Sequence, residues 1–367
     1  MKILTISNCT LNRSQGSGYV ILNHDDYARQ LGYTVDLFGP ETYQLFKKAH
    51  WGNSYRITLG IFFLLLKLRV KHYDIIEFWG GESWLGVWYI KTWYPNKVIV
   101  HKSNGIEEHV ATSLKKYQWE PPAQKKWYHF DASKLYKYAE LQSDLIVTVS
   151  RYDKEFILKH AYKNADKVLS IYPGMTEAFM NLDVDYNREN SIGFCGSWIE
   201  RKGKSIIIED INKVLKHYPD LKVIFIGVGN HIEKESVFPN IDPERIIIYS
   251  SVSDKRELTE VYKKISVAFM PSYHESFGLV LAEAMACGCA AVTSNTGYAF
   301  DLTHKEHAYI MPEIKAGYLF GGISWLLDHP EERKYIARNG YEKVQGLRWM
   351  ASLPELYAYY TSILIQK

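Results

Sequence analysis

The sequence predicts an α/β protein made of two doubly wound domains, each with a parallel sheet covered by helices. Two observations lead to this prediction. Short, continuously apolar runs of strand length alternate with longer stretches of helical period, which is typical of parallel strands buried on both faces. This pattern occurs twice, on either side of a polar, asparagine-rich segment at residues 179–191. A chain of 367 residues is also long enough for about two domains.

Eleven short runs rich in β-branched and other apolar residues are predicted to be strands. The first set lies at 2–7, 33–38, 73–78, 97–101, 144–150 and 167–172. The second set lies at 191–195, 221–227, 245–250, 265–270 and 289–294. The intervals within each set have room for helical crossovers. In folds of this kind ligands bind beyond the carboxyl ends of the strands, so we expect the functional site there.

The polar segment between the two sets follows Pro173 and Gly174, and we interpret it as a connector. The predicted boundaries are therefore a first domain at 1–175, a linker at 176–190, a second domain at 191–345 and a last helix at 346–367.

Composition excludes several classes of protein. The chain has 44 Lys and Arg against 41 Asp and Glu, a net charge of +3 that is too balanced for a nucleic-acid partner. The longest apolar run, at 57–66, falls short of the roughly 20 residues that a membrane span needs. The first residues lack the apolar region and cleavage pattern of a signal peptide, and the four cysteines suit neither a disulfide framework nor a zinc site. We therefore expect a cytoplasmic protein.

Two Gly-x-Gly strings follow predicted strands, at 16–18 and 227–229. Neither has the third glycine of a dinucleotide fingerprint, which argues against a nicotinamide cofactor. The first string opens a helix near Tyr19. It either lets backbone N–H groups approach a ligand or forms a simple tight turn.

Asp183 and Asp185 form an Asp-x-Asp motif of the kind that chelates a metal. They lie in the predicted connector and not at the end of a strand. We interpret them as solvated linker carboxylates, and no metal site is expected.

The most informative stretch follows the strand at 265–270. A turn carries Glu275, and a helix that is apolar on nearly every face is predicted from residue 276 or 277 to Gly288. The unsatisfied N–H groups and positive dipole at the start of this helix favour an anion. Glu275 and Glu283 are unsuited to phosphate but can accept hydrogen bonds from sugar hydroxyls. The alternatives at this point are a sugar-phosphate site and a merely structural helix.

A second stretch places two cations at another junction between a strand and a helix. The strand at 191–195 is followed by Gly196, a loop with Arg201 and Lys202, and a helix from Gly203. Cations facing the same cleft would neutralise a diphosphate leaving group. A solvated basic turn is the alternative interpretation.

These two stretches resemble glycosyltransferase family 4, whose members have the GT-B fold and transfer a sugar from a nucleotide sugar with retention of configuration. Glu275 and Glu283 match the family's E-x7-E signature, and GSWIERKG at 196–203 matches its basic loop. Weaker matches lie at 103–109, 143–156, 250–272 and 353–364. The resemblance implies two Rossmann-like domains that face a central cleft, with the last helix returning to the first domain.

The resemblance also implies roles for individual residues. Lys202, assisted by Arg201, would contact the donor diphosphate, while Glu275 would contact the transferred sugar and Glu283 the ribose. Ser197 stands where the family usually has an arginine, and Asn104 stands where many relatives have a histidine, so that its amide would orient a hydroxyl. The other implied donor-binding positions are Phe277, Gly278, Leu279, Ser251, Val252, Gly16, Ser17 and Gly18.

A reaction of this family uses front-face departure of the nucleotide and usually needs no metal and no cofactor. The implied acceptor is a saccharide or a lipid-linked saccharide in cell-surface polysaccharide or glycoconjugate synthesis. The alternatives are another GT-B enzyme, such as a nucleotide-sugar epimerase or an inverting transferase, and a two-lobed sugar-binding protein without catalysis.

Two segments of the first domain bear on the acceptor. Residues 56–71 combine an uncharged run with basic flanks and are interpreted either as a helix buried beside the sheet or as a helix on a membrane surface. Residues 114–130 interleave Lys with Trp and Tyr, which suits an acceptor sugar or an anionic lipid surface as well as an exposed loop. Seven of the ten Trp precede residue 130. Peripheral contact with the inner face of the cell membrane is therefore one expectation.

Overall fold

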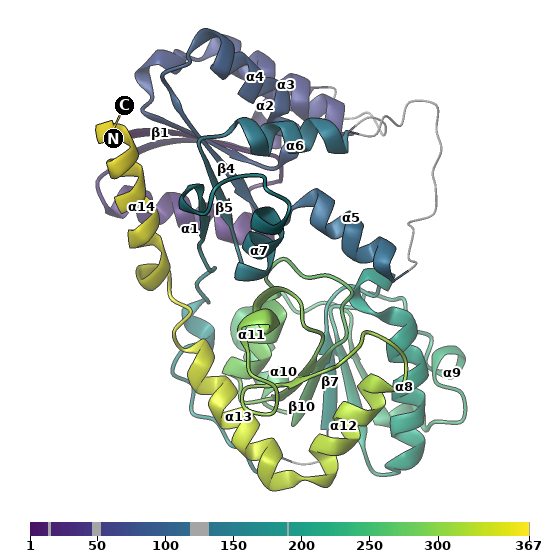
Figure 1. The fold of residues 1–367 in the computed structure, drawn as a ribbon. Helices are drawn as coiled ribbons and strands as arrows, with labels where there is room; N and C mark the ends of the chain where they lie inside the picture. The colour runs from purple at the N-terminus through teal and green to yellow at the C-terminus, as the bar shows by residue number, and fades with distance from the viewer. Residues whose placement is uncertain (14–15, 46–52, 118–131, 189–190, 367) are drawn as a thin grey trace. The chain divides into compact units, whose positions relative to one another are not determined.

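A computed structural model describes residues 1–13, 16–45, 53–117, 132–188 and 191–366. The chain divides into two compact units (Figure 1). The first unit consists of Met1–Thr112, Glu120–Gly174 and Trp349–Lys367, and the second of Ser113–Trp119 and Met175–Arg348. Each unit is built around one parallel sheet of six strands, as the prediction of two doubly wound domains requires.

The sheet of the first unit has the order β2-β1-β3-β4-β5-β6, and every neighbouring pair is parallel. Its strands are β1 (Lys2–Ser7), β2 (Thr34–Phe38), β3 (Ile75–Trp79), β4 (Val98–Ser103), β5 (Leu145–Thr148) and β6 (Val168–Ser170). Every residue of β3 and β4 is buried, as expected for central strands with helices on both faces.

Eight α-helices begin in the described part of the first unit. They are α1 (Gly16–Gln30), α2 (Pro40–Tyr43), α3 (Asn53–Lys67), α4 (Trp84–Trp93), α5 (Glu107–Lys116), α6 (Ser133–Gln142), α7 (Arg151–Lys159) and α14 (Trp349–Gln366).

The sheet of the second unit has the order β12-β11-β10-β7-β8-β9, again entirely parallel. Its strands are β7 (Ser191–Cys195), β8 (Lys222–Ile226), β9 (Ile246–Tyr249), β10 (Val267–Met270), β11 (Ala290–Thr293) and β12 (Tyr309–Ile310). Its helices are α8 (Lys204–His217), α9 (Lys234–Val237), α10 (Lys255–Tyr262), α11 (Leu279–Ala286), α12 (Tyr318–Asp328) and α13 (Pro330–Val344). All eleven predicted strands are present, and only the two-residue edge strand β12 was missed.

Helix α14 packs on the first unit although it follows the whole second unit in sequence. Its buried face, Leu353, Leu356, Tyr357 and Tyr360, joins the core that includes Ile3, Val35 and Val98. Figure 1 shows this helix ending beside the N-terminus. The chain thus returns to the first unit after it has formed the second.

A buried polar network fixes α14 against the sheet. Lys102 and Glu77 form an ion pair of 2.7 Å between strands β4 and β3, and the Lys102 side chain is completely buried. The Glu77 carboxylate also accepts hydrogen bonds from the hydroxyls of Thr5 (2.8 Å) and Tyr360 (2.7 Å). A buried charge pair is tolerated only when its remaining hydrogen-bonding capacity is satisfied, and Tyr360 supplies part of it.

The segment predicted as a linker, 176–190, makes specific contacts in the second unit. Val184 packs closely on Gly288. A Cβ on Gly288 would lie 2.0 Å from a methyl carbon of Val184. The Arg188 guanidinium donates to the backbone carbonyls of Ile265 (2.8 Å) and Cys287. Up to Arg188 this part of the chain is therefore bound to the unit that follows it.

Two predicted helix starts were displaced. Helix α1 begins at Gly16, earlier than the expected start near Tyr19. Helix α11 begins at Leu279, later than the expected start at 276 or 277, because Gly278 adopts a left-handed conformation with φ of +89° that interrupts the helix.

The prediction for residues 114–130 lies largely outside the described residues, as do Trp51, Trp119 and Trp127. Among the described helices, none combines the length and apolar character that a membrane span requires.

Candidate functional site

The topology of the second unit marks one place for a ligand. Strands β7 and β10 are neighbours at the centre of the sheet, and the chain leaves them toward opposite edges. Loops that follow such strands separate and leave a crevice at the carboxyl ends of the strands. Lys202 follows β7 and Glu275 follows β10, so the topology brings the two predicted stretches to the same crevice.

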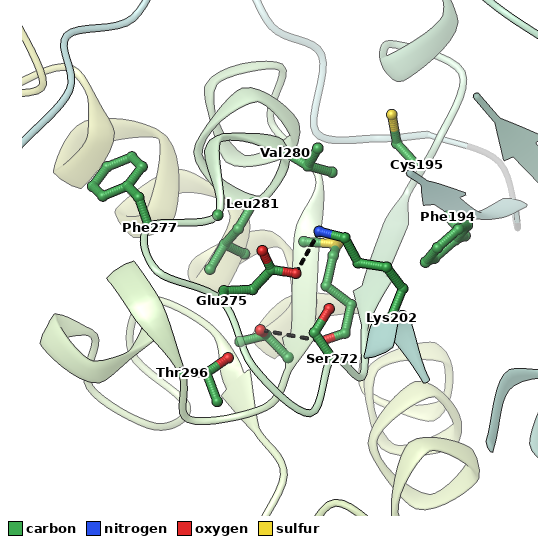
Figure 2. A pocket seen from close by; sticks show the side chains of 12 residues that line it. Phe194, Cys195, Lys202, Ser272, Glu275, Phe277, Val280, Leu281 and Thr296 are labelled. Carbon is green, nitrogen blue, oxygen red and sulfur yellow. Dashed lines mark hydrogen bonds and ion pairs between the residues drawn. The ribbon is translucent and has the colours of Figure 1, made fainter. Parts of the chain in front are cut away.

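A small pocket lies in this crevice (Figure 2). The lining residues come from the ends of β7, β10 and β11 and from the loops that follow them. They are Phe194, Cys195, Lys202, Met270, Ser272, Glu275, Phe277, Gly278, Val280, Leu281, Thr293 and Thr296. The pocket thus has apolar walls with a few polar groups, as is usual for small-molecule sites.

Lys202 and Glu275 form an ion pair inside this pocket. The Nζ of Lys202 lies 2.5 Å from Oε1 of Glu275, and each side chain is 17% exposed. Burial opposes ionisation of Glu275, but the charges of Lys202 and Arg201 outweigh it and lower the pKa of this carboxyl. Glu275 is therefore an anion at neutral pH, able to accept hydrogen bonds but not to act as a general acid.

The two loops that carry this pair are tied together. Gly203 has a φ of +81°, and a Cβ there would lie 2.3 Å from the carbonyl oxygen of Pro271, so only glycine permits this approach. Arg201 donates to the carbonyl of His274 over 3.1 Å, and its own carbonyl accepts the N–H of Tyr273 over 2.9 Å. Arg201 thus holds the loop of Glu275, while Lys202 faces the pocket.

The start of α11 forms another wall of the pocket. Gly278 precedes the helix in the left-handed region, and Leu281 donates the first helical hydrogen bond back to Gly278. The first N–H groups of an α-helix have no acceptor within the helix and carry its positive dipole end. Phe277 is buried against the ring of Tyr298, with a centroid distance of 5.3 Å, which fixes the turn before the helix. The geometry suits an anion in front of Gly278 and Leu279.

Glu283 projects from α11 and is nearly buried. Burial raises the pKa of this carboxyl, although Lys255 at 2.7 Å opposes the shift. Lys255 is the first residue of α10, after the capping residue Asp254. Lys255 was not predicted as a site residue. Its position just after the β9 loop, at the same edge of the sheet, could have indicated that it lies near the site.

The other predicted donor-binding residues of the second unit lie in loops at the same edge but do not line the pocket. Ser197 is exposed after β7, Ser251 is exposed after β9, and Val252 is half-buried beside it. Contacts of these residues with a nucleotide stay predictions. Ser272, Thr293 and Thr296 line the pocket and were not predicted, because nothing in their sequence context separates them from structural hydroxyls.

Four predicted residues belong to the first unit. Gly16, Ser17 and Gly18 form the first turn of α1 after β1, and Asn104 follows β4. A Cβ at Gly18 would lie 2.4 Å from the carbonyl oxygen of Asn12, so close packing against the preceding loop explains that glycine. Ligand contacts by residues 16–18 and by Asn104 stay predictions.

The first unit has its own polar cluster at the point where its strand order reverses. Asn8 follows β1 and Glu82 follows β3, and the Asn8 amide donates to the Glu82 carboxylate over 2.8 Å. Ser54 donates to the other carboxylate oxygen over 3.3 Å. Gly80, with a φ of +93°, leaves no room for a Cβ beside Asn8. This edge is the equivalent topological position in the first sheet.

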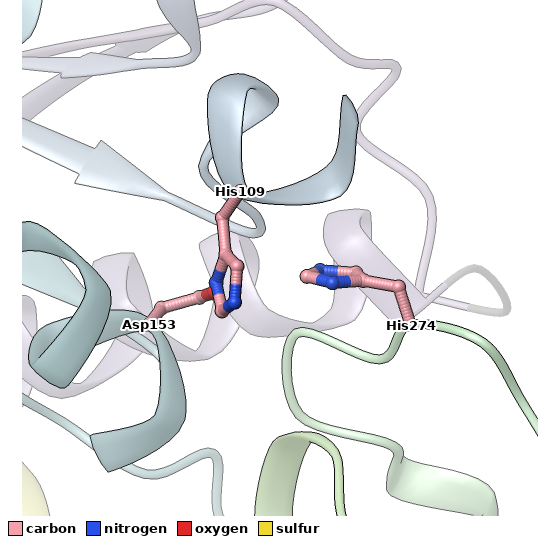
Figure 3. Close-up of side chains that lie close together, drawn as sticks. All are labelled: His109, Asp153 and His274. Carbon is pink, nitrogen blue, oxygen red and sulfur yellow. The ribbon is translucent and has the colours of Figure 1, made fainter. Parts of the chain in front are cut away.

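Two buried histidines of the first unit differ in their surroundings. Nδ1 of His109 lies 2.7 Å from the carboxylate of Asp153, and the two side chains point toward each other (Figure 3). A carboxylate at Nδ1 fixes the tautomer of the ring. His101, inside β4, is completely buried, and neither ring nitrogen has a partner among the described residues.

The Asp183 and Asp185 carboxylates are exposed in the segment before β7. Asp185 accepts the backbone N–H of Asn187 over 2.8 Å, which is a local turn contact. Among the described residues neither aspartate belongs to a group of side chains placed to hold a metal ion.

Comparison with known proteins relates the second unit to a described family. Residues 182–343 match the model of the family described as glycosyl transferases group 1. The matched range lies inside the second unit, which is therefore similar to a group 1 glycosyltransferase domain. The matched range contains both the Lys202 loop and the two glutamates of α11 and its preceding turn.

Relatives of this chain carry glycosyltransferase names. An uncharacterized glycosyltransferase of Methanocaldococcus jannaschii is 28% identical over 220 residues, 59% of this chain and 58% of the relative. A D-inositol 3-phosphate glycosyltransferase of Corynebacterium jeikeium is 31% identical over 118 residues, 30% of this chain and 28% of the relative. The matches thus span less than two thirds of these relatives' lengths.

Solved structures match the fold over the full chain. Sucrose-phosphate synthase from Thermosynechococcus elongatus has a TM-score of 0.76 at 16% identity, with 100% of both chains covered. The catalytic domain of starch synthase IV from Arabidopsis thaliana has a TM-score of 0.70 at 13% identity, with 99% of both covered. At these identities the likeness shows the fold alone. The whole chain has the GT-B fold.

Proposed function

We propose that this protein is a retaining glycosyltransferase. It moves a sugar from a UDP- or GDP-linked donor to a hydroxyl of a saccharide or lipid-linked saccharide, in the synthesis of a cell-surface polysaccharide or glycoconjugate. The observation that carries the proposal is the Lys202–Glu275 pair in front of α11, at the strand-order reversal of a unit similar to a group 1 glycosyltransferase domain. A solved structural neighbour, HepE of Anabaena, is in complex with UDP, which supports a nucleotide ligand.

Different residues of the site contact different parts of the donor. Lys202 and the N–H groups of Gly278 and Leu279 stabilise the negative charge that develops on the diphosphate as the glycosidic bond breaks. Glu275, ionised, accepts hydrogen bonds from the hydroxyls of the transferred sugar. Glu283, which is paired with Lys255, accepts hydrogen bonds from the hydroxyls of the ribose. Arg201 fixes the position of the turn that carries Glu275, because its guanidinium donates to the His274 carbonyl.

In the proposed mechanism no side chain attacks the sugar. The acceptor hydroxyl forms the new bond on the face from which the diphosphate departs, and its proton passes to the leaving phosphate oxygen. Because Lys202 supplies the charge at that oxygen, the reaction needs no metal ion. We place the protein in the cytoplasm, with no nucleic-acid partner.

Incubation of the protein with UDP-, GDP- and ADP-sugars and NMR analysis of the product test this proposal. The expected product keeps the anomeric configuration of the donor, and its yield is unchanged by EDTA. An inverted anomer identifies an inverting transferase, and release of UDP with an epimerised sugar but no acceptor identifies an epimerase. Binding of the donor without turnover under any condition would favour a sugar-binding protein.

A further inference from the structure

Helices α3 and α4 lie side by side in the first unit (Figure 1). Both helices carry exposed apolar side chains. One face of α3, with Ile57, Ile61 and Leu65, is buried under the sheet. The opposite side stays exposed. We define the α3–α4 face as the exposed residues Tyr55, Leu59, Phe63 and Leu66 of α3 and Trp88 and Trp93 of α4. The buried side is what the interpretation of residues 56–71 as a helix beside the sheet expects, and contact of this segment with a membrane stays a prediction.

A continuous row of aromatic rings connects the two helices. The ring of Phe63 contacts Phe62 (5.8 Å between centroids), and Phe62 contacts Tyr89 (5.7 Å). Tyr89 contacts Trp93 (5.3 Å), which meets Trp88 edge-on (5.2 Å). Trp88 is 41% exposed and Trp93 56%. A contiguous exposed patch of this kind marks an interaction surface, unlike scattered single apolar residues.

The charged residues of α3, of α4 and of the segment at 67–71 that ends α3 are all basic. Neither α3 nor α4 contains an Asp or a Glu. The segment that ends α3 carries the exposed cations Lys67, Arg69 and Lys71, and no ion pair joins any of them to another described residue. The one cation of α4, Lys91, is paired with Asp144 over 3.0 Å. The α3–α4 face is therefore apolar, with cations at the end of α3 that are unpaired among the described residues, a charge that suits an anionic partner.

We propose that the α3–α4 face docks this protein onto the anionic surface of a lipid bilayer. Trp and Tyr favour the level of the lipid headgroups, where an aromatic ring meets apolar and polar surroundings at once. Exposed leucine and phenylalanine between them enter the acyl boundary, while Lys67, Arg69 and Lys71 face lipid phosphates. The docking goes beyond the proposed transferase activity, since neither a donor nor an acceptor sugar takes part in it.

Sedimentation of the full chain with vesicles tests this directly. The protein is mixed with vesicles of phosphatidylcholine alone or with phosphatidylglycerol added, without nucleotide. We expect binding to the anionic vesicles, weakened by salt, and tryptophan emission quenched by brominated lipid. The double variant Trp88→Ser/Trp93→Ser should weaken binding about ten-fold or more and lose most of the quenching. Each of Lys67→Ala and Lys71→Ala should weaken binding to anionic vesicles about five-fold.

A matched control removes equally exposed apolar side chains elsewhere. Met350→Ser/Tyr335→Ser replaces residues that are 67% and 55% exposed and should bind vesicles like the wild type. Thermal melting and donor turnover in solution show that each variant is folded and separate this test from that of the transferase proposal.

Three results would overturn the docking proposal. One is a wild-type protein that stays in the supernatant and is not quenched by brominated lipid. Another is equal loss of binding in the Met350/Tyr335 control. The third is a concentration-dependent dimer that the Trp88/Trp93 variant dissociates, which would assign the face to a second copy of the chain.

Discussion

Lys202 illustrates how a single contact decides the chemistry of the pocket. Its Nζ is held by Glu275 at 2.5 Å in a site that is mostly shielded from water, close to where the proposed diphosphate would enter. Electrostatic stabilisation of this kind acts only on charge that develops in the transition state. The sequence identified both partners but not their pairing, because they lie 73 positions apart.

Lys202→Ala should reduce kcat by about a hundred- to a thousand-fold, the usual loss when one preorganised donor to a developing anion is removed. Lys202→Arg should recover part of it. The readout is steady-state turnover of the donor together with a thermal melt. Lys213→Ala, an exposed lysine of α8, serves as the control and should leave kcat unchanged. Near-normal turnover of Lys202→Ala would exclude this residue from the mechanism.

His101 makes a second prediction at the residue scale. Burial lowers the pKa of this imidazole to about 4, below its ordinary value of 6.5. The unfolded chain therefore binds the proton first, and between these two pH values acidification favours unfolding by at most about 1.4 kcal/mol per pH unit. The stability that depends on neutral His101 is complete above pH 6.5 and is lost as the pH falls toward 4.

His101→Phe removes this pH dependence of stability. It also removes two buried nitrogens that have no partner among the described residues. We expect its free energy of unfolding to match or exceed that of the wild type at pH 7 and to exceed it clearly at pH 5. Urea denaturation at several pH values provides the measurement. A constant difference between the two proteins from pH 7 to pH 5 would show that His101 does not titrate in this range.

Among the elements, α14 depends most on contacts made far along the chain. Its apolar residues are sufficient to predict a helix, but its partner is a sheet whose last strand ends at Ser170. The Tyr360 hydroxyl donates to Glu77, which also holds the buried ammonium of Lys102. A side chain that satisfies a buried ion pair stabilises more than an exposed hydrogen bond does.

Tyr360→Phe should lower the free energy of unfolding of the first unit by about 1.5–3 kcal/mol, because it removes a hydrogen bond to a buried carboxylate. Tyr335→Phe, at an exposed tyrosine of α13, should change it by less than about 0.5 kcal/mol. Equilibrium denaturation followed by circular dichroism distinguishes the two. An equal effect of both substitutions would mean that the network does not hold α14.

Element boundaries were predicted less well than element types. The apolar character of α11 and the two glutamates around it were evident from the sequence. The delayed start at Leu279 depends on the left-handed Gly278, and the space for that turn depends on Gly297, where a Cβ would lie 2.4 Å from the carbonyl oxygen of Phe277. Contacts between backbone segments that are distant in sequence leave no periodic pattern.

For the whole molecule, the lining residues of the proposed donor pocket all belong to the second unit. A nucleotide should therefore protect this unit first, and at about 100 times its dissociation constant it should add about 2.7 kcal/mol of stability. Hydrogen exchange with and without UDP should show slowed exchange at residues 195–204 and 271–283. Protection confined to β1–β6 would contradict the placement of the site.

The sequence alone determined the alternation of strands and helices, the division into two doubly wound domains, and the residue types of the Lys202 loop and the Glu275 turn. These properties are local, because they follow from hydrophobic period and from the short spacing of polar residues at strand ends. Tertiary structure decided which of those residues meet. It paired Lys202 with Glu275 and Lys255 with Glu283, returned α14 to the first sheet, and exposed one side of α3 beside Trp88 and Trp93. Strand order and helix packing set such neighbours, and these are properties of the folded chain that no short segment encodes.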